Sequence, residues 1–178
     1  MTKTSRLIIM GRPRGFDTLN CTENDVWEIE KHENATNLRY GKGICYGRWE
    51  TPDHNYDNYY TYLVYPEKGK KFSDINGREG SYFGISLVLR NQKVKEEDVI
   101  KLGNLLNEVY NIYIYNKYIK VYGNGNIQWM VEKLDEKMYQ NIANGLNEII
   151  KSKPELSIHL IDENSGKAAY NQKNNYTR

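Results

Sequence analysis

The sequence predicts an α+β fold in which a mainly antiparallel sheet of about six to eight strands carries two amphipathic helices packed on one face. Short runs rich in β-branched and aromatic residues are separated by turns that contain glycine, which is typical of antiparallel hairpins. Two later segments instead have apolar residues at helical spacing. The chain has 178 residues, a length that suits one domain, and it contains no repeat of fixed period.

The first half of the chain is expected to supply most of the sheet. Its strand-like runs alternate apolar and polar residues or are continuously apolar, and they cover residues 6–10, 25–31, 37–40, 44–50, 59–65 and 81–89. Gly41-Lys42-Gly43 lies between two of these runs and predicts a hairpin connection. Residues 67–80 are dense in lysine, glycine, aspartate and asparagine, so we expect an exposed loop there.

Two helices are predicted from apolar stripes. The first begins at Glu96, where acidic residues favour a helix N-terminus, and its stripe consists of Val99, Leu102, Leu105, Leu106, Val109 and Tyr113. The second follows the N-cap Asp135, and its stripe consists of Leu134, Met138, Ile142, Leu146, Ile149 and Ile150. Gly145 inside this helix predicts either a close packing contact or a break, because glycine is about 1 kcal/mol less favourable there than alanine.

The remaining segments complete the domain. Gly123-Asn124-Gly125 lies between the strand-like runs 117–122 and 126–131 and predicts a second hairpin. A short strand is expected over residues 156–161. Residues 163–178 are polar and rich in asparagine and lysine, which indicates a tail or linker. We therefore expect a single α+β domain over residues 1–162.

The composition favours a cytoplasmic protein that does not bind membranes. The 25 Lys and Arg nearly balance the 23 Asp and Glu, so no overall field attracts the chain to nucleic acid or to anionic lipid. The first apolar run, residues 7–10, is too short for a signal peptide or a membrane span. Only two cysteines are present, which gives no disulfide framework. Sixteen tyrosines are expected to supply part of the apolar core.

Arginines beside glycines are the candidate ligand-binding residues. Arg12 and Arg14 lie in Gly11-Arg12-Pro13-Arg14-Gly15, which lacks the spacing of the known phosphate-binding loops. Arg78 follows Gly77, and Arg48 stands between Gly47 and Trp49. If these guanidiniums converge near Trp49, they would form a pocket for a nucleotide or RNA. The alternative is that each arginine forms a separate ion pair or supports a turn.

Metal and catalytic sites are less well supported by the sequence. Asp53, Asn55 and Asp57 have the first ligand offsets of a calcium loop, but Asn58 replaces the turn glycine and the final glutamate is missing. Neither cysteine lies in a catalytic signature with a histidine. We therefore predict no metal and no cofactor, and catalytic activity is undecided but disfavoured.

The leading hypothesis is a non-catalytic protein-interaction or adaptor domain of a bacterial or phage conflict system, in defence or immunity. Its partner would be another protein or a second copy of the chain, since tyrosine, tryptophan and arginine favour interaction surfaces. The alternative is a nucleotide- or RNA-binding domain that uses the arginine and aromatic pocket. A third hypothesis is a hydrolase with a cysteine and histidine pair, which requires these two side chains to meet in a cleft.

Overall fold

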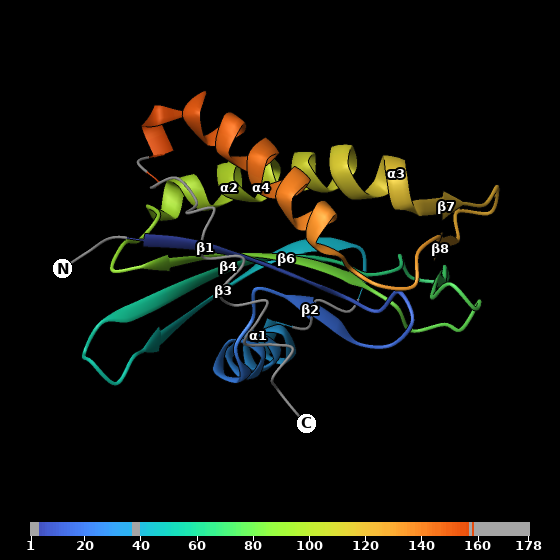
Figure 1. Cartoon of the computed structure of the whole chain (residues 1–178), viewed down its shortest axis with the longest axis horizontal. Helices are drawn as coiled ribbons and strands as arrows, with labels where there is room; N and C mark the ends of the chain where they lie inside the picture. The colour runs from blue at the N-terminus through green and yellow to red at the C-terminus, as the bar shows by residue number, and fades with distance from the viewer. Residues whose placement is uncertain (1–3, 37–39, 157, 159–178) are drawn as a thin grey trace.

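The computed structural model describes residues 4–36, 40–156 and 158. Its largest element is a five-stranded antiparallel sheet with the strand order β2-β1-β6-β4-β3. The strands are β1 (Thr4–Gly11), β2 (Asp17–Leu19), β3 (Lys42–Glu50), β4 (Tyr56–Val64) and β6 (Phe83–Arg90). The central strand β6 pairs with β1 and β4 along its full length, so segments far apart in sequence form the middle of the sheet (Figure 1).

A smaller sheet of three strands lies at one end of the large sheet, at the right of Figure 1. It consists of β5 (Phe72–Ser73), β7 (Ile119–Val121) and β8 (Ile127–Trp129). The hairpin predicted around residues 123–125 is confirmed, because β7 and β8 pair antiparallel. β5 pairs with β8 in the parallel direction. The α+β class and the mainly antiparallel pairing are therefore confirmed, but the strands form two sheets rather than one.

Both predicted helices are present, and they lie side by side on one face of the large sheet (Figure 1). A 3₁₀ turn (Glu96–Asp98) leads into α2 (Val99–Tyr110), which continues as a π-helix (Asn111–Tyr115) and the short α3 (Asn116–Tyr118). α4 spans Glu136–Lys151. Asp135 is its N-cap as predicted, since its carboxylate accepts a hydrogen bond from the Met138 amide at 2.8 Å.

The prediction of a strand over residues 25–31 is wrong, because this segment belongs to the helix α1 (Glu23–Thr36). A reciprocal cap starts the helix: the Asp25 amide donates to the Thr22 hydroxyl at 3.2 Å, and the Thr22 amide donates to the Asp25 carboxylate at 2.8 Å. Trp27, which the alternating pattern assigned to the core, is 60% exposed. α1 covers the face of the sheet opposite to α2 and α4 (Figure 1).

α1 is attached to the sheet through a buried polar group as well as apolar contacts. The Asp25 carboxylate is 2% exposed, pairs with the Arg6 guanidinium at 2.5 Å and accepts a hydrogen bond from the Tyr59 hydroxyl at 3.1 Å. Burial and the neighbouring Asp25 carboxylate raise the pKa of Tyr59. If α1 moved away from the sheet, the buried charges of Asp25 and Arg6 would lose their partners, which is strongly unfavourable. These contacts therefore fix the position of the helix.

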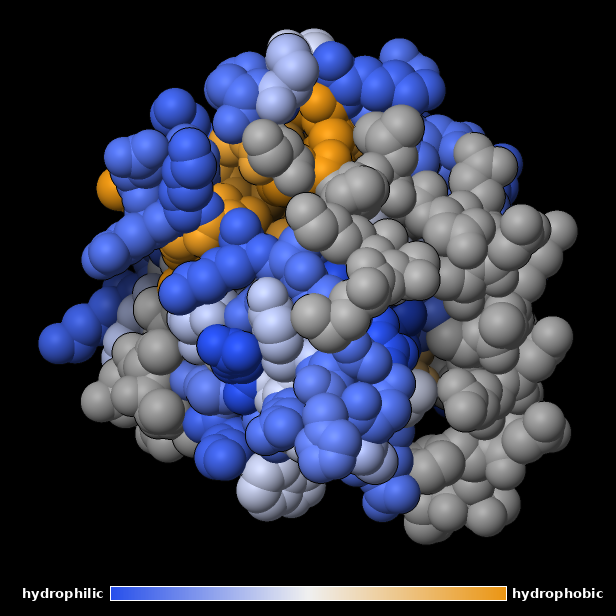
Figure 2. Space-filling view, turned by 90° about the vertical axis from the view of Figure 1, so that its left-hand side faces the viewer, coloured by the Kyte–Doolittle hydropathy of each residue, from blue (hydrophilic) through white to orange (hydrophobic). Residues whose placement is uncertain are grey.

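The sheet separates two apolar cores, because alternate residues of each strand point to opposite faces. The core under α2 and α4, called here the α2/α4 core, includes Leu7, Ile9, Tyr60, Tyr62, Phe83, Ile85, Leu87, Leu102, Leu106, Tyr110, Trp129, Ile142 and Leu146. The α1 core consists of Ile8, Met10, Cys21, Ile29, Cys45, Tyr59, Leu63, Tyr82 and Val88. Figure 2 shows one end of the molecule, where hydrophobic residues gather between the helices and the sheet within a mostly hydrophilic surface.

Several smaller predictions concern the ends of elements. Residues 67–80 are a loop as expected, apart from the short β5. Lys42 and Gly43, which were expected in a turn, belong to β3 instead. Residues 37–39, most of the strand predicted over 156–161 and the predicted tail 163–178 lie outside the described residues. Among the described residues, no helix has the length and apolar character needed to cross a membrane.

Candidate functional site

Three of the predicted ligand-binding arginines lie at the end of the large sheet that adjoins the small sheet. Arg12 follows β1, and its guanidinium lies over the rings of Phe16 and Tyr82 at 5.6 and 5.7 Å from their centroids. Arg14 is exposed and lies 3.6 Å from Glu132. Arg78 pairs with Asp74 at 2.9 Å. These arginines are close in the fold because the Ile75 amide donates to the Pro13 carbonyl at 2.8 Å.

Arg48 does not join the other three arginines. It lies in β3 opposite Asn58. Lys42 begins β3 at the end nearest the small sheet, and Arg48 is six positions further along the strand, which corresponds to roughly 20 Å of extended chain. Its guanidinium lies 4.0 Å from the centroid of the Tyr56 ring. Trp49, the adjacent residue, packs against the α1 core. Arg48 therefore lies apart from Arg12, Arg14 and Arg78, and ligand binding by these residues stays a prediction.

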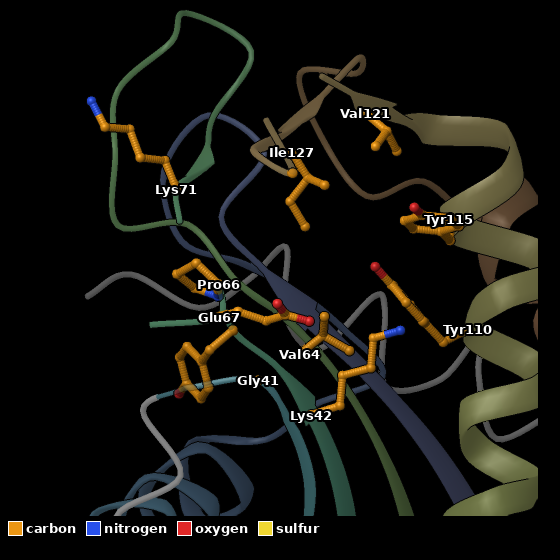
Figure 3. Close-up of a pocket in the computed structure, with 12 residues that line it drawn as sticks. Gly41, Lys42, Val64, Pro66, Glu67, Lys71, Tyr110, Tyr115, Val121 and Ile127 are labelled. Carbon is orange, nitrogen blue, oxygen red and sulfur yellow. The ribbon is translucent and has the colours of Figure 1, made fainter. Parts of the chain in front are cut away.

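A cavity lies elsewhere, between the end of the large sheet, the π-helix and the small sheet (Figure 3). It has a volume of about 480 Å³, within the range of small-ligand pockets. We call it the Lys42 pocket. Its lining consists of Gly41, Lys42, Val64, Tyr65, Pro66, Glu67, Lys71, Tyr110, Tyr115, Val121, Gly125 and Ile127.

The π-helix gives the pocket its aromatic wall. Hydrogen bonds of the i→i+5 type are rare in proteins, and those that occur are often at functional sites. They place residues five apart on one helix face. Tyr110 and Tyr115 have this spacing, and their ring centroids are 5.9 Å apart. In an ordinary α-helix the same two side chains would diverge by more than a quarter turn. The unusual turn therefore brings both phenols to the same cavity.

Lys42 and Glu67 supply opposite charges to the pocket. The Lys42 ammonium lies 5.2 Å from the centroid of the Tyr110 ring and 5.7 Å from that of Tyr115. Within the described part of the chain, neither Lys42 nor Glu67 forms an ion pair, whereas Lys71 pairs with Glu79 at 2.7 Å. In Figure 3 the Lys42 ammonium and the Glu67 carboxylate point toward the same space, and Lys71 points away. Each of the two charges is thus available to a ligand.

The Tyr110 hydroxyl is a further polar group at this site. It is fully buried and has no hydrogen-bond partner among the described residues, while the Tyr62 hydroxyl beside it donates to the Asn107 side chain. Burial, and then the neighbouring Tyr62 and Tyr115, raise the pKa of Tyr110, so it stays protonated. In Figure 3 the Tyr110 hydroxyl points toward the cavity. A buried hydroxyl without a partner is uncommon.

Apolar residues complete the lining of the pocket. Val64 ends β4, Val121 ends β7 and Ile127 begins β8, so the wall is built from both sheets. Pro66 extends it beside Glu67. Lys42, Glu67, the tyrosines and an aliphatic wall can hold a molecule that combines charged groups with an apolar body.

The other sequence candidates lie apart from the Lys42 pocket. Asp53 pairs with Arg90 at 2.5 Å, and Asp57 lies in β4 opposite Trp49. Among the described residues, no three His, Cys, Asp or Glu side chains are grouped so that they could hold a metal ion. Cys21 and Cys45 are both buried in the α1 core, on the opposite side of the sheet from α2. The cysteine hydrolase hypothesis remains untested.

The sequence analysis missed all the polar residues of the Lys42 pocket. Lys42 was assigned to a turn, Glu67 to a loop, and Tyr110 lay outside the predicted apolar stripe. The spacing of Tyr110 and Tyr115 matches no ordinary helix face, so only the π-helix makes it meaningful. Comparison of the chain with protein-family models, with curated proteins and with solved structures found no match.

Proposed function

We propose that this chain is a non-catalytic binding domain, and that its ligand is a small zwitterion with an apolar body held in the Lys42 pocket. The observation that carries the proposal is that Lys42 and Glu67, two opposite charges without an ion-pair partner among the described residues, line one cavity with an aliphatic wall. Lys42 would bind the anionic group of the ligand, and Glu67 would bind its ammonium. An amino acid or dipeptide with an apolar side chain has this chemistry.

The volume and the walls of the pocket support a ligand of this size. A cavity of about 480 Å³ accommodates an amino acid or a dipeptide, and the walls of small-ligand sites are mostly apolar with few polar groups. Val64, Val121 and Ile127 would contact the apolar body.

A thermal-shift screen of the purified protein tests this proposal. A ligand that binds the folded state raises the melting temperature, so we expect a rise with apolar amino acids or dipeptides and none with nucleotides. Lys42→Met and Glu67→Gln should each weaken binding about tenfold or more, since a hydrogen bond to a charged group contributes about 1.5–3 kcal/mol. The matched control is Lys93→Met, because Lys93 also lies over a tyrosine ring, Tyr46, but outside the pocket.

Two results would contradict the proposal. The first is the absence of any shift across the amino acids and dipeptides. The second is a shift that Lys42→Met and Glu67→Gln leave unchanged, because binding would then occur elsewhere. A shift with nucleotides alone would favour the nucleotide hypothesis, and the arginine group Arg12, Arg14 and Arg78 would be its first candidate.

A protein-binding or adaptor role is the second candidate function. The observation that favours it is the strand β3 at the edge of the large sheet, on which Tyr46 and Arg48 are exposed. A strand edge offers backbone hydrogen bonds to a partner strand. A role in a bacterial or phage conflict system remains a hypothesis, and a pull-down from cell extract tests it.

A further inference from the structure

β3 is a long strand at the edge of the large sheet. It has 9 residues, whereas β2 at the other edge has 3. Among the described residues, no strand pairs with the outer side of β3. Edge strands usually avoid association by being short, or by carrying a proline, a bulge or a charge in the middle. β3 has no proline, pairs with β4 without a register break, and has the aromatic Tyr46 at its centre.

The hydrogen bonds at both ends of β3 show which backbone groups face outward. The Gly41 carbonyl accepts from the Tyr65 amide, and the Thr51 amide donates to the Asn55 carbonyl, each at 2.8 Å. In an antiparallel pair, alternate residues bond to the same neighbour, so the odd-numbered residues of β3 bond to β4. The amides and carbonyls that face outward are those of Lys42, Ile44, Tyr46, Arg48 and Glu50.

These five residues are complementary to themselves in the antiparallel direction. A two-fold axis at Tyr46 places Lys42 opposite Glu50 of a second copy, at both ends of the paired strands. All five outward-facing residues then lie opposite outward-facing residues, so each pair can exchange two backbone hydrogen bonds. Opposite charges across an antiparallel pair are stabilising. Lys42 and Glu50 are both exposed in the structure.

The neighbouring registers are worse. An axis at Cys45 places Lys42 opposite Arg48 of the second copy, which puts like charges together at both ends. An axis at Gly47 leaves Lys42 beyond the end of the partner strand and pairs Glu50 with Ile44. The charge pattern of β3 therefore selects one register out of those that the backbone allows.

We infer that two copies of this chain associate through antiparallel pairing of their β3 strands, with the two-fold axis at Tyr46. The two large sheets then join into one continuous sheet, and the outward-facing backbone groups of β3 become paired. Paired residues in antiparallel strands have their side chains on the same face, so both α1 helices lie on one side of the joined sheet. This inference gives the second candidate function a defined partner, and Lys42 takes part both in it and in the Lys42 pocket.

The oligomeric state in solution tests this inference. Sedimentation velocity or light scattering across a wide concentration range should show a dimer that dissociates on dilution. Glu50→Lys should raise the dissociation constant about tenfold or more, because attraction becomes repulsion at both ends. The double variant with Lys42→Glu and Glu50→Lys should restore the dimer.

A backbone variant separates strand pairing from side-chain contacts. Arg48→Pro removes an outward-facing amide, and proline is tolerated at a strand edge when its nitrogen faces solvent. Arg48→Ala removes the same side chain and keeps the amide. We expect Arg48→Pro to be monomeric and Arg48→Ala to remain dimeric, with equal far-ultraviolet circular dichroism. A monomeric wild type or a dimeric Arg48→Pro would overturn the inference, and a dimer that Glu50→Lys does not weaken would overturn the register.

Discussion

Two neighbouring tyrosines in the α2/α4 core differ in the partner of the hydroxyl. The Tyr62 hydroxyl donates to the Asn107 side chain, while the buried Tyr110 hydroxyl has no partner among the described residues. Their rings are 6.3 Å apart between centroids and share the same apolar surroundings. The pair therefore isolates the energetic effect of satisfying a buried hydroxyl.

We expect the two phenylalanine substitutions to have opposite effects on stability. Tyr110→Phe should leave the free energy of unfolding unchanged or raise it by up to about 1 kcal/mol, because an unpaired buried hydroxyl is desolvated without compensation. Tyr62→Phe should lower it by about 1 kcal/mol, because it leaves the Asn107 oxygen without its donor. Urea denaturation of the ligand-free proteins measures both, and equal losses would contradict this account.

Asp57 is a residue whose ionisation opposes folding. Burial raises its pKa above the ordinary value of 3.8, although Arg6 acts in the opposite direction. Because the pKa of Asp57 is raised in the folded state, the protonated carboxyl stabilises the fold relative to the ionised one. This contribution to the free energy of unfolding is present below the ordinary pKa and is lost as the pH rises through the raised pKa. At neutral pH the ionised Asp57 therefore destabilises the fold.

Asp57→Asn should accordingly be more stable than the wild type at neutral pH. The difference should shrink as the pH falls through the raised pKa of Asp57 and should vanish below about 3.8, where the wild-type carboxyl is protonated. Chemical denaturation at several pH values measures this difference. A stability difference that stays constant with pH would show that the carboxyl titrates normally.

At the scale of the elements, α4 and α2 each contain a glycine, and the two glycines have different surroundings. A Cβ atom added to Gly145 in α4 would lie 2.3 Å from the Tyr113 ring. One added to Gly103 in α2 would lie 3.6 Å from Ile44, which is an ordinary contact. The expected close packing contact at Gly145 is confirmed, and the helix continues through it without a break.

Alanine at these two positions should therefore change stability in opposite directions. Gly145→Ala should lower the free energy of unfolding by about 2 kcal/mol, since overpacking outweighs the gain in helix propensity. Gly103→Ala should raise it by up to about 1 kcal/mol, because only the propensity gain applies. Thermal and urea denaturation measure both variants, and stabilisation by Gly145→Ala would contradict the packing argument.

The elements also show which parts of the fold local sequence can predict. β1, β4, β6 and α4 were predicted because the signals for them, apolar spacing and for α4 also a helix cap, lie within short stretches of consecutive residues. α1 was missed because alternation at Trp27 and Ile29 imitated a strand, although the cap signal Thr22-Glu23-Asn24-Asp25 was present. The cap identifies a helix start more directly than a short alternating run does.

The candidate site was harder to predict than the fold. Lys42, Glu67 and Tyr110 come from three elements, and their proximity depends on how the sheet end meets the helical layer. The π-helix also shifted the buried stripe: the prediction placed Tyr113 in the core after Val109, whereas the structure fully buries Ile114. No local pattern shows where a helix will take an i→i+5 turn.

For the molecule as a whole, the two cores share the same strands. β1 places Leu7 and Ile9 in the α2/α4 core and Ile8 and Met10 in the α1 core. β4 and β6 likewise alternate between the two faces. Neither core can lose its packing while the sheet remains intact for the other, so the domain should unfold in one cooperative step.

Tryptophan fluorescence can test this cooperativity. Trp129 is buried in the α2/α4 core, and Trp49 packs against the α1 core. In variants that keep only one of these tryptophans, the fluorescence transition should coincide with the loss of far-ultraviolet circular dichroism in the same variant. If the Trp49 signal changes before the circular dichroism does, α1 and its core form an independent unit.

The central position of β6 also has a consequence for how the chain is made. β1 is hydrogen-bonded to β6 along its whole length, with Thr4 opposite Arg90. β1 therefore emerges from the ribosome long before this partner strand exists. At synthesis rates of about 5–20 residues per second, the wait is roughly four to fifteen seconds. During that time the apolar residues 7–10 have no sheet to join, and the nascent chain at this stage is the form that most needs a chaperone.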